Sequence, residues 1–191
     1  MVGVAVEPTP YRWDVRSYQA MITAGILGKE DRVELLDGEI IQMAPMGNPH
    51  MASVDFLTRA FVTALGDRAI VRVQGSFVLS MLSMPQPDLL LLRPRRDFYR
   101  LGNAAPDDVF LVVEVSGSSR AHDRLRKVPL FAKGGVREAW IVNVPDGTIE
   151  VCRRPGPDGY QEVRTAGTGE AVSPEAFPDI AVGVDDVLGL G

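Results

Sequence analysis

Two acidic residues stand at the ends of apolar runs near the middle of the chain. Asp88 precedes residues 89–92, which are all leucine, and Glu114 lies toward the end of the apolar run 110–116. Continuous apolar runs of this length predict strands that are covered on both faces. A carboxylate in such a place is costly to bury without a compensating charge, and two neighbouring carboxylates repel each other. We therefore predict that a divalent cation lies between Asp88 and Glu114.

The donor types narrow the choice of ion and of chemistry. Carboxylate oxygens are hard ligands that suit Mg²⁺ or Mn²⁺. The sequence has one cysteine and two widely separated histidines, so it does not indicate a structural zinc site. It also lacks the glycine-rich turn of a phosphate-binding loop and a Gly-x-Ser-x-Gly nucleophile motif.

A lysine follows the second acidic strand. Asp123 and Lys127 are four residues apart on an expected helix, so they share one face of it. One interpretation is a surface ion pair of little energetic value. The other is that Lys127 reaches back over the strand end to the carboxylates, where it would orient an attacking water and stabilise charge on a phosphate.

The remaining sequence supplies the elements that must hold these side chains. The order predicts an α/β fold in which the strands around Asp88, Glu114 and Trp140 are adjacent, the last two parallel because a helix connects them. The expected elements are a helix over 15–27 capped by Asp14, a hairpin over 32–43 turning at Asp37-Gly38, a helix over 50–65, a bent strand or strand pair over 69–80, the two acidic strands, a helix over 121–132 kinked or broken at Pro129, strands over 137–144, 148–153 and 160–165, and a terminal segment to 188.

Length and composition set the class of protein. The 191 residues suit one domain, residues 1–191, with 1–10 as a loose N-terminal arm. Cys152 is the one cysteine, so no internal disulfide forms and a cytoplasmic location is expected. No signal peptide and no apolar run of roughly 18 residues is seen, so we expect no membrane association.

The charge bears on nucleic-acid binding. A net charge of −5 argues against a non-specific nucleic-acid coat protein, but it permits contact through a local patch. Arg93, Arg95 and Arg96 could grip phosphates, or they could be solvated charges of an exposed loop.

The series of motifs resembles the Uma2 (DUF820) family of the PD-(D/E)xK nuclease superfamily. Pro87-Asp88, Glu114-Val115-Ser116 and Lys127 occur in the family's order and spacing. Residues 34–38 look like its early Glu-x-x-x-Gly element, and His50 matches a histidine that opens its next helix. The resemblance covers most of the chain. It implies a restriction-endonuclease-like mixed sheet core flanked by helices, with an N-terminal helix and hairpin and C-terminal strands.

Two departures from the superfamily pattern matter. A lysine two residues after Glu114 would complete the motif, but Ser116 stands there; in Uma2-like chains the lysine lies on the following helix, where Lys127 matches it. Asn143 and Phe131 replace a usual aspartate and a usual tyrosine.

The resemblance also implies roles and partners. Asp88, Glu114 and the Val115 backbone carbonyl would bind Mg²⁺ or Mn²⁺, Glu34 would be an accessory acid, and Lys127 would position the water. His50, Ser116 and Asp123 are accessory candidates. The implied reaction is metal-dependent endonucleolytic hydrolysis of DNA, and a homo-oligomer is expected because many relatives cleave two strands.

Simpler roles stay open for each residue. Asp88 would then only cap a strand, Glu114 would pair with an arginine, Glu34 would be an exposed hairpin charge, and His50 would cap a helix or lie on the surface. Two alternative functions also stay open. One is a catalytically inactive nuclease fold that serves as a nucleic-acid-binding or scaffold module. The other is an enzyme that acts on a different phosphate ester.

Overall fold

A computed structural model describes residues 9–28, 30–117 and 126–190. Within these ranges no helix combines the length and apolar character needed to cross a lipid bilayer. The helices and strands are α1 (Val15–Thr23), β1 (Val33–Leu36), β2 (Glu39–Gln42), α2 (Asn48–Leu65), η1 (Gly66–Arg68), β3 (Ile70–Val73), β4 (Leu89–Leu92), η2 (Pro106–Asp108), β5 (Val109–Ser116), α4 (Val128–Lys133), β6 (Glu138–Asn143), β7 (Thr148–Gly156), β8 (Gly159–Ala166), β9 (Ala171–Val172), β10 (Val182–Gly183) and α5 (Val184–Leu188).

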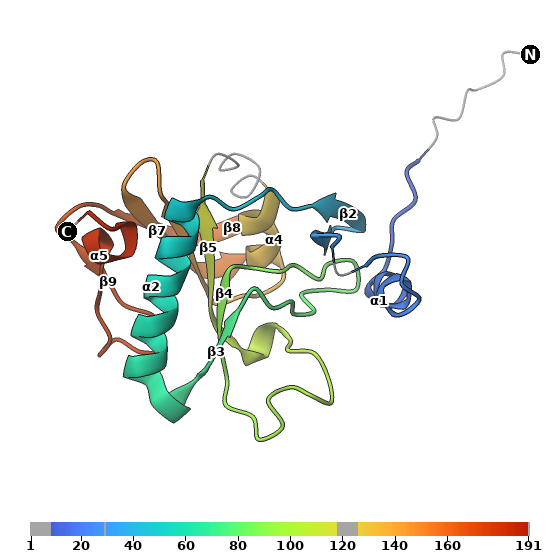
Figure 1. The fold of residues 1–191 in the computed structure, drawn as a ribbon, viewed down its shortest axis with the longest axis horizontal. Helices are drawn as coiled ribbons and strands as arrows, with labels where there is room; N and C mark the ends of the chain where they lie inside the picture. The colour runs from blue at the N-terminus through green and yellow to red at the C-terminus, as the bar shows by residue number, and fades with distance from the viewer. Residues whose placement is uncertain (1–8, 29, 118–125, 191) are drawn as a thin grey trace, which may run out of the picture.

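A six-stranded mixed sheet forms the centre of the molecule (Figure 1). Its strand order is β3-β4-β5-β6-β7-β8. The pair β5–β6 is parallel and every other neighbouring pair is antiparallel. This confirms the predicted α/β class, the adjacency of the strands around Asp88, Glu114 and Trp140, and the parallel direction of the last two.

The sheet is covered on both faces, as the continuous apolar runs predicted. Because strand side chains alternate, Leu89 and Leu91 pack into a core layer with α2, while Leu90 and Leu92 pack into a second layer. The first layer contains α2 and α5, with the rings of Phe61 and Trp140 6.0 Å apart. The second layer contains α4. In Figure 1 α2 crosses one face of the sheet while α4 lies behind it.

The predicted hairpin forms a separate two-stranded sheet, β1–β2. Asp37 and Gly38 at its turn have φ of +49° and +76°, as a tight two-residue hairpin turn requires. Leu35 exchanges backbone hydrogen bonds with Met84, of 3.4 and 2.8 Å. The hairpin is therefore tied to the segment that leads into β4, and this contact sets the position of Glu34.

Three predicted elements differ in extent. Asp14 caps α1 as predicted, but the helix ends at Thr23 rather than 27, because Gly25 takes a left-handed φ of +72°. In the region 69–80, strand structure is limited to β3, and Gln74 follows it with φ of +48°.

The third is the helix predicted over 121–132. Its first half lies outside the described residues, and α4 begins at Val128. Pro129 lies in the first turn of α4, where a missing N–H leaves no hydrogen bond unmade, and the two residues directly before α4, Arg126 and Lys127, are π-helical.

Candidate active site

The two strand carboxylates meet through the register of β4 and β5. Leu89 pairs with Val113 in this antiparallel ladder. Carried one residue further, the same register sets Asp88 opposite Glu114, and directly opposed residues have Cβ atoms about 4.5–5.5 Å apart. Glu114 has the same parity as Val112, which packs on the face that α4 covers. The Glu114 side chain therefore points to the face of the sheet that α4 covers.

Asp88 is held from two directions. Its Oδ1 lies 2.9 Å from Nε2 of His50, and its Oδ2 accepts a hydrogen bond of 2.8 Å from the backbone N–H of Val115. His50 lies in the first turn of α2, whose N-cap is Gly47. The expectation that His50 is a cap or a surface residue is therefore wrong, because its imidazole contacts the buried Asp88 carboxylate.

Glu34 comes from the hairpin and is nearly buried, with 3% of its surface exposed. Its Oε2 accepts a hydrogen bond of 3.1 Å from the backbone N–H of Gln86. An exposed hairpin charge is therefore the wrong description of Glu34. The tie between β1 and Met84 brings this carboxylate to the site.

Lys127 joins the carboxylates from the α4 side. Its Nζ lies 3.0 Å from Oε1 of Glu34 and 3.1 Å from Oε1 of Glu114. Lys127 is buried, with 3% exposure, so it is not part of a surface ion pair. Its predicted partner Asp123 lies outside the described residues.

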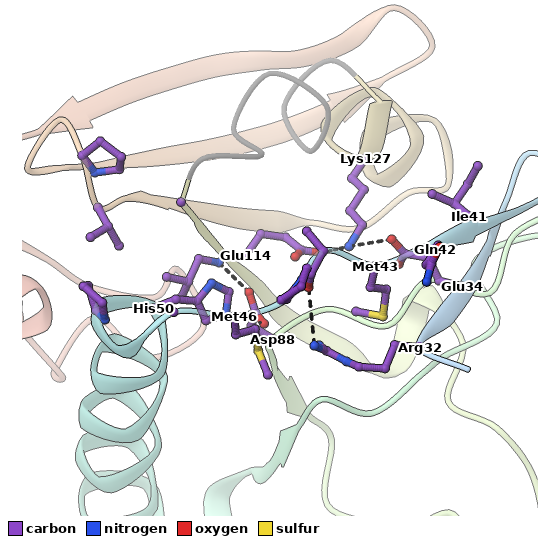
Figure 2. A pocket seen from close by; sticks show the side chains of 18 residues that line it. Arg32, Glu34, Ile41, Gln42, Met43, Met46, His50, Asp88, Glu114 and Lys127 are labelled. Carbon is purple, nitrogen blue, oxygen red and sulfur yellow. Dashed lines mark hydrogen bonds and ion pairs between the residues drawn. The ribbon is translucent and has the colours of Figure 1, made fainter. Parts of the chain in front are cut away.

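These side chains line one cavity of about 450 Å³ (Figure 2). Figure 2 shows Glu34, Glu114 and Lys127 directed toward one another, with His50 beside Asp88. Apolar side chains form much of the remaining wall. The lining residues are Arg32, Glu34, Ile41, Gln42, Met43, Ala44, Pro45, Met46, Gly47, Pro49, His50, Asp88, Glu114, Val115, Gly117, Lys127, Val144 and Pro145.

Other candidates are not brought to this cavity. Ser116 does not line it; its buried Oγ has no hydrogen-bond partner among the described residues. Arg93, Arg95 and Arg96 follow the carboxyl end of β4, the end opposite Asp88. Arg95 pairs with Asp97, and Arg93 donates to the carbonyl of Asp107.

The donor set fits a partly hydrated Mg²⁺ or Mn²⁺. Asp88 has one hydrogen bond at each oxygen, and a carboxylate offers about four lone-pair sites, so it retains capacity for an ion. Over the described ranges, no three His, Cys, Asp or Glu side chains form a ready-made metal cluster. Mg²⁺ usually binds through one or two carboxylates plus water and substrate phosphate, so a complete protein cage is not required.

A further buried acid, Glu138, was not singled out by the sequence. It accepts hydrogen bonds from Nε1 of Trp140, from the guanidinium of Arg153 and from the backbone N–H of Glu175. Burial raises its pKa, although these donors act in the opposite direction. Glu138 does not line the cavity and joins β6 to the C-terminal segment.

The comparisons with known proteins agree with this fold. A family model named Uma2, described as "Putative restriction endonuclease", matches residues 15–185. A crystal structure of a protein from Anabaena variabilis ATCC 29413, described as a putative nuclease belonging to DUF820, superposes with a TM-score of 0.71 at 14% identity. The match covers 92% of this chain and 97% of that one. No curated protein matches the sequence.

The fold is thus a mixed α/β nuclease-like fold with a cluster of acids and a lysine at one end of its sheet. Since the family model spans most of the chain, the chain belongs to the Uma2 family. This confirms the resemblance that the order of the motifs indicated.

Proposed function

We propose that this protein is a divalent-metal-dependent endonuclease that hydrolyses phosphodiester bonds in DNA. The observation that carries the proposal is the meeting of Glu34, Asp88, Glu114 and Lys127, drawn from separate regions of the sequence, in one cavity. The family description "Putative restriction endonuclease" and the likeness to a structure described as a putative nuclease support the same class of reaction.

In this proposal Asp88, Glu114 and the backbone carbonyl of Val115 would hold the ion. When bound, the ion would supply Lewis acidity, lowering the pKa of a water and offsetting charge on the phosphate. His50 would fix the orientation of Asp88 through their 2.9 Å contact.

Lys127 and Glu34 would act on the water and the phosphate. The Lys127 ammonium has three N–H donors, and its contacts with the two glutamates hold it at the centre of the cluster. From there it would orient the attacking water and donate to a phosphate oxygen as negative charge develops on it. Glu34 would hold the Lys127 ammonium in place through their ion pair and would add a third carboxylate to the site.

Plasmid cleavage tests the proposal. Supercoiled DNA is incubated with Mg²⁺ or Mn²⁺ and with EDTA, and wild type is compared with Asp88→Ala and Glu114→Ala. We expect both substitutions to lower the rate about a hundredfold or more, the scale seen when a group that stabilises transition-state charge is removed. Asp67→Ala is the matched control, because Asp67 is exposed at the far end of α2.

Cleavage that survives equally in both site variants would indicate a contaminating nuclease and would contradict the proposal. DNA binding without cleavage would favour the non-catalytic module. RNA and small phosphodiesters assayed in parallel would reveal a different ester substrate. The homo-oligomer, a dimer or higher, stays a prediction that sedimentation velocity at micromolar concentration checks.

A further inference from the structure

One cation of the cavity has no role in the mechanism above. Arg32 lines the cavity and lies two residues before Glu34, continuing strand β1. Its backbone carbonyl accepts a hydrogen bond of 2.7 Å from Met43, so the hairpin ladder extends to it. Residues two apart on a strand point to the same side, about 7 Å apart. In Figure 2 the Arg32 side chain extends from the hairpin into the cavity.

The Arg32 guanidinium makes one weak hydrogen bond within the described part of the chain. Its hydrogen bond from Nη1 to the carbonyl of Ala44 is long, at 3.4 Å. A guanidinium has five N–H donors, and Arg32 forms no ion pair with a carboxylate of the described residues that line the cavity. In contrast, Arg12 and Arg126 nearby both pair with Glu39.

The acidic side chains of the cavity make a further cation useful for binding a phosphate. Three carboxylates line it, those of Glu34, Asp88 and Glu114, and the Lys127 ammonium contacts two of them. Without a bound cation, a phosphodiester anion that approaches this cluster meets net negative charge, so a further positive group at the cavity favours its binding. A planar guanidinium binds phosphate through two parallel hydrogen bonds, so it offers orientation as well as charge.

We propose that Arg32 is a substrate-binding residue that grips a backbone phosphate of the nucleic acid at this cavity. The inference rests on the proposed function for the identity of the substrate. It adds a positioning contact, made by the hairpin, to the cluster of acids and lysine. The hairpin would then contribute both Glu34 and a phosphate contact from one strand face.

Binding measured without hydrolysis tests this role. Fluorescence anisotropy of a short fluorescein-labelled DNA, single-stranded and duplex, is followed in EDTA over about 50 to 200 mM salt, where phosphate contacts show as a slope of log K against log salt. The proteins are wild type, Arg32→Gln, Arg32→Lys and Arg137→Gln. Arg137 is an exposed arginine just before β6, at the sheet end opposite Glu114, so it is the matched control.

We expect Arg32→Gln to weaken binding about tenfold and to reduce the salt slope by about 1, as the loss of one phosphate contact does. Arg32→Lys should restore the slope but not the full affinity, because it keeps the charge and loses the planar fork. Arg137→Gln should bind like wild type. Arg32 is exposed, so these substitutions leave the core intact.

The inference is overturned if Arg32→Gln binds within twofold of Arg137→Gln, or if the wild-type protein shows no salt-dependent binding. Its failure is separable from that of the proposed function. Cleavage that depends on Asp88, combined with unchanged binding by Arg32→Gln, refutes the Arg32 role alone. Weakened binding by Arg32→Gln without any Asp88-dependent cleavage supports the phosphate contact and refutes the nuclease.

Discussion

Replacing Lys127 by methionine would test how the buried charges of the site are balanced. The lysine contacts Glu34 at 3.0 Å and Glu114 at 3.1 Å, and the three side chains are only 4 to 6% exposed. Methionine is similar in length to lysine but has no charge. The substitution therefore leaves two neighbouring buried carboxylates without the cation between them.

The magnitude follows from burial. At an effective dielectric constant near 20, each contact of about 3 Å is worth roughly 5 kcal/mol of Coulomb attraction, but desolvation of the ions offsets most of it. Removing one partner of a buried ion pair costs about 3–5 kcal/mol, because the remaining charge stays buried and uncompensated. For a domain of this size that loss lowers Tm by about 6–20 °C.

Urea unfolding followed by circular dichroism at neutral pH measures the effect. Lys133→Met is the control, since Lys133 is an exposed lysine at the end of α4, the helix that Lys127 precedes, and its replacement should change stability by at most about 0.5 kcal/mol. Adding Glu34→Gln to Lys127→Met should recover part of the loss, because one of the two repelling charges is removed. If Lys127→Met unfolds within about 1 kcal/mol of Lys133→Met, the reasoning about buried charge is refuted.

Three further outcomes are expected. His50→Ala should lower the cleavage rate about 10–100-fold, because His50 orients Asp88, a proposed metal ligand; an unchanged rate would contradict this. Hydrogen bonds from Arg68 lower the pKa of Asp179 to about 2 from 3.8, so this pair stabilises the fold above pH 3.8 and the contribution is lost as pH falls toward 2. The substitution Arg68→Gln should return the pKa of Asp179 toward 3.8, which NMR titration measures. Phe61→Ala should cost about 3–5 kcal/mol in urea unfolding, since Phe61 is fully buried in the core layer between α2 and the sheet.

The two acidic strands were predictable because each carries its own local signal. Runs of apolar residues with one acid at an end indicate buried strands, and β4 and β5 are buried along almost their whole length. The register was not predictable. It depends on hydrogen bonds between residues about 24 positions apart, such as the pair Leu89 and Val113, and no local pattern reports it.

The burial of Glu34 and Lys127 was undecided from the sequence for the same reason. Glu34 accepts a hydrogen bond from Gln86, which is 52 residues away, and pairs with Lys127, which follows β5 in the sequence. On a hairpin, Glu34 has the same local signature as a solvated charge. The matching order of the family's motifs was the signal that raised it as a site residue.

At the end of α1 the sequence pattern predicted more burial than the structure shows. Tyr18, Ile22 and Ile26 recur at helical spacing, which is typical of one apolar helix face, yet Ile22 is 47% and Ile26 is 69% exposed. Tyr18 is buried because it packs in the small core layer with Leu35 and Met84, and its hydroxyl donates to the carbonyl of Val33. Periodicity predicts a face, but it does not supply the element that covers that face.

The buried acids of this chain separate into two kinds, and the separation supports the assignment of the site. Glu138 is surrounded by donors from Trp140, Arg153 and Glu175. Glu138 is fully buried, and burial raises the pKa of its carboxyl group. Removing any of these donors would leave this buried group with fewer hydrogen bonds and lower the stability of the fold. The hydrogen bonds of Glu138 therefore stabilise the fold. The site acids are buried in the wall of a cavity instead, where each oxygen of Asp88 has one hydrogen bond and keeps capacity for a further ligand. Buried charges in proteins are paired or coordinate metals, and carboxylates that line a cavity, such as Asp88 and Glu114, have the chemistry to bind a hard cation there.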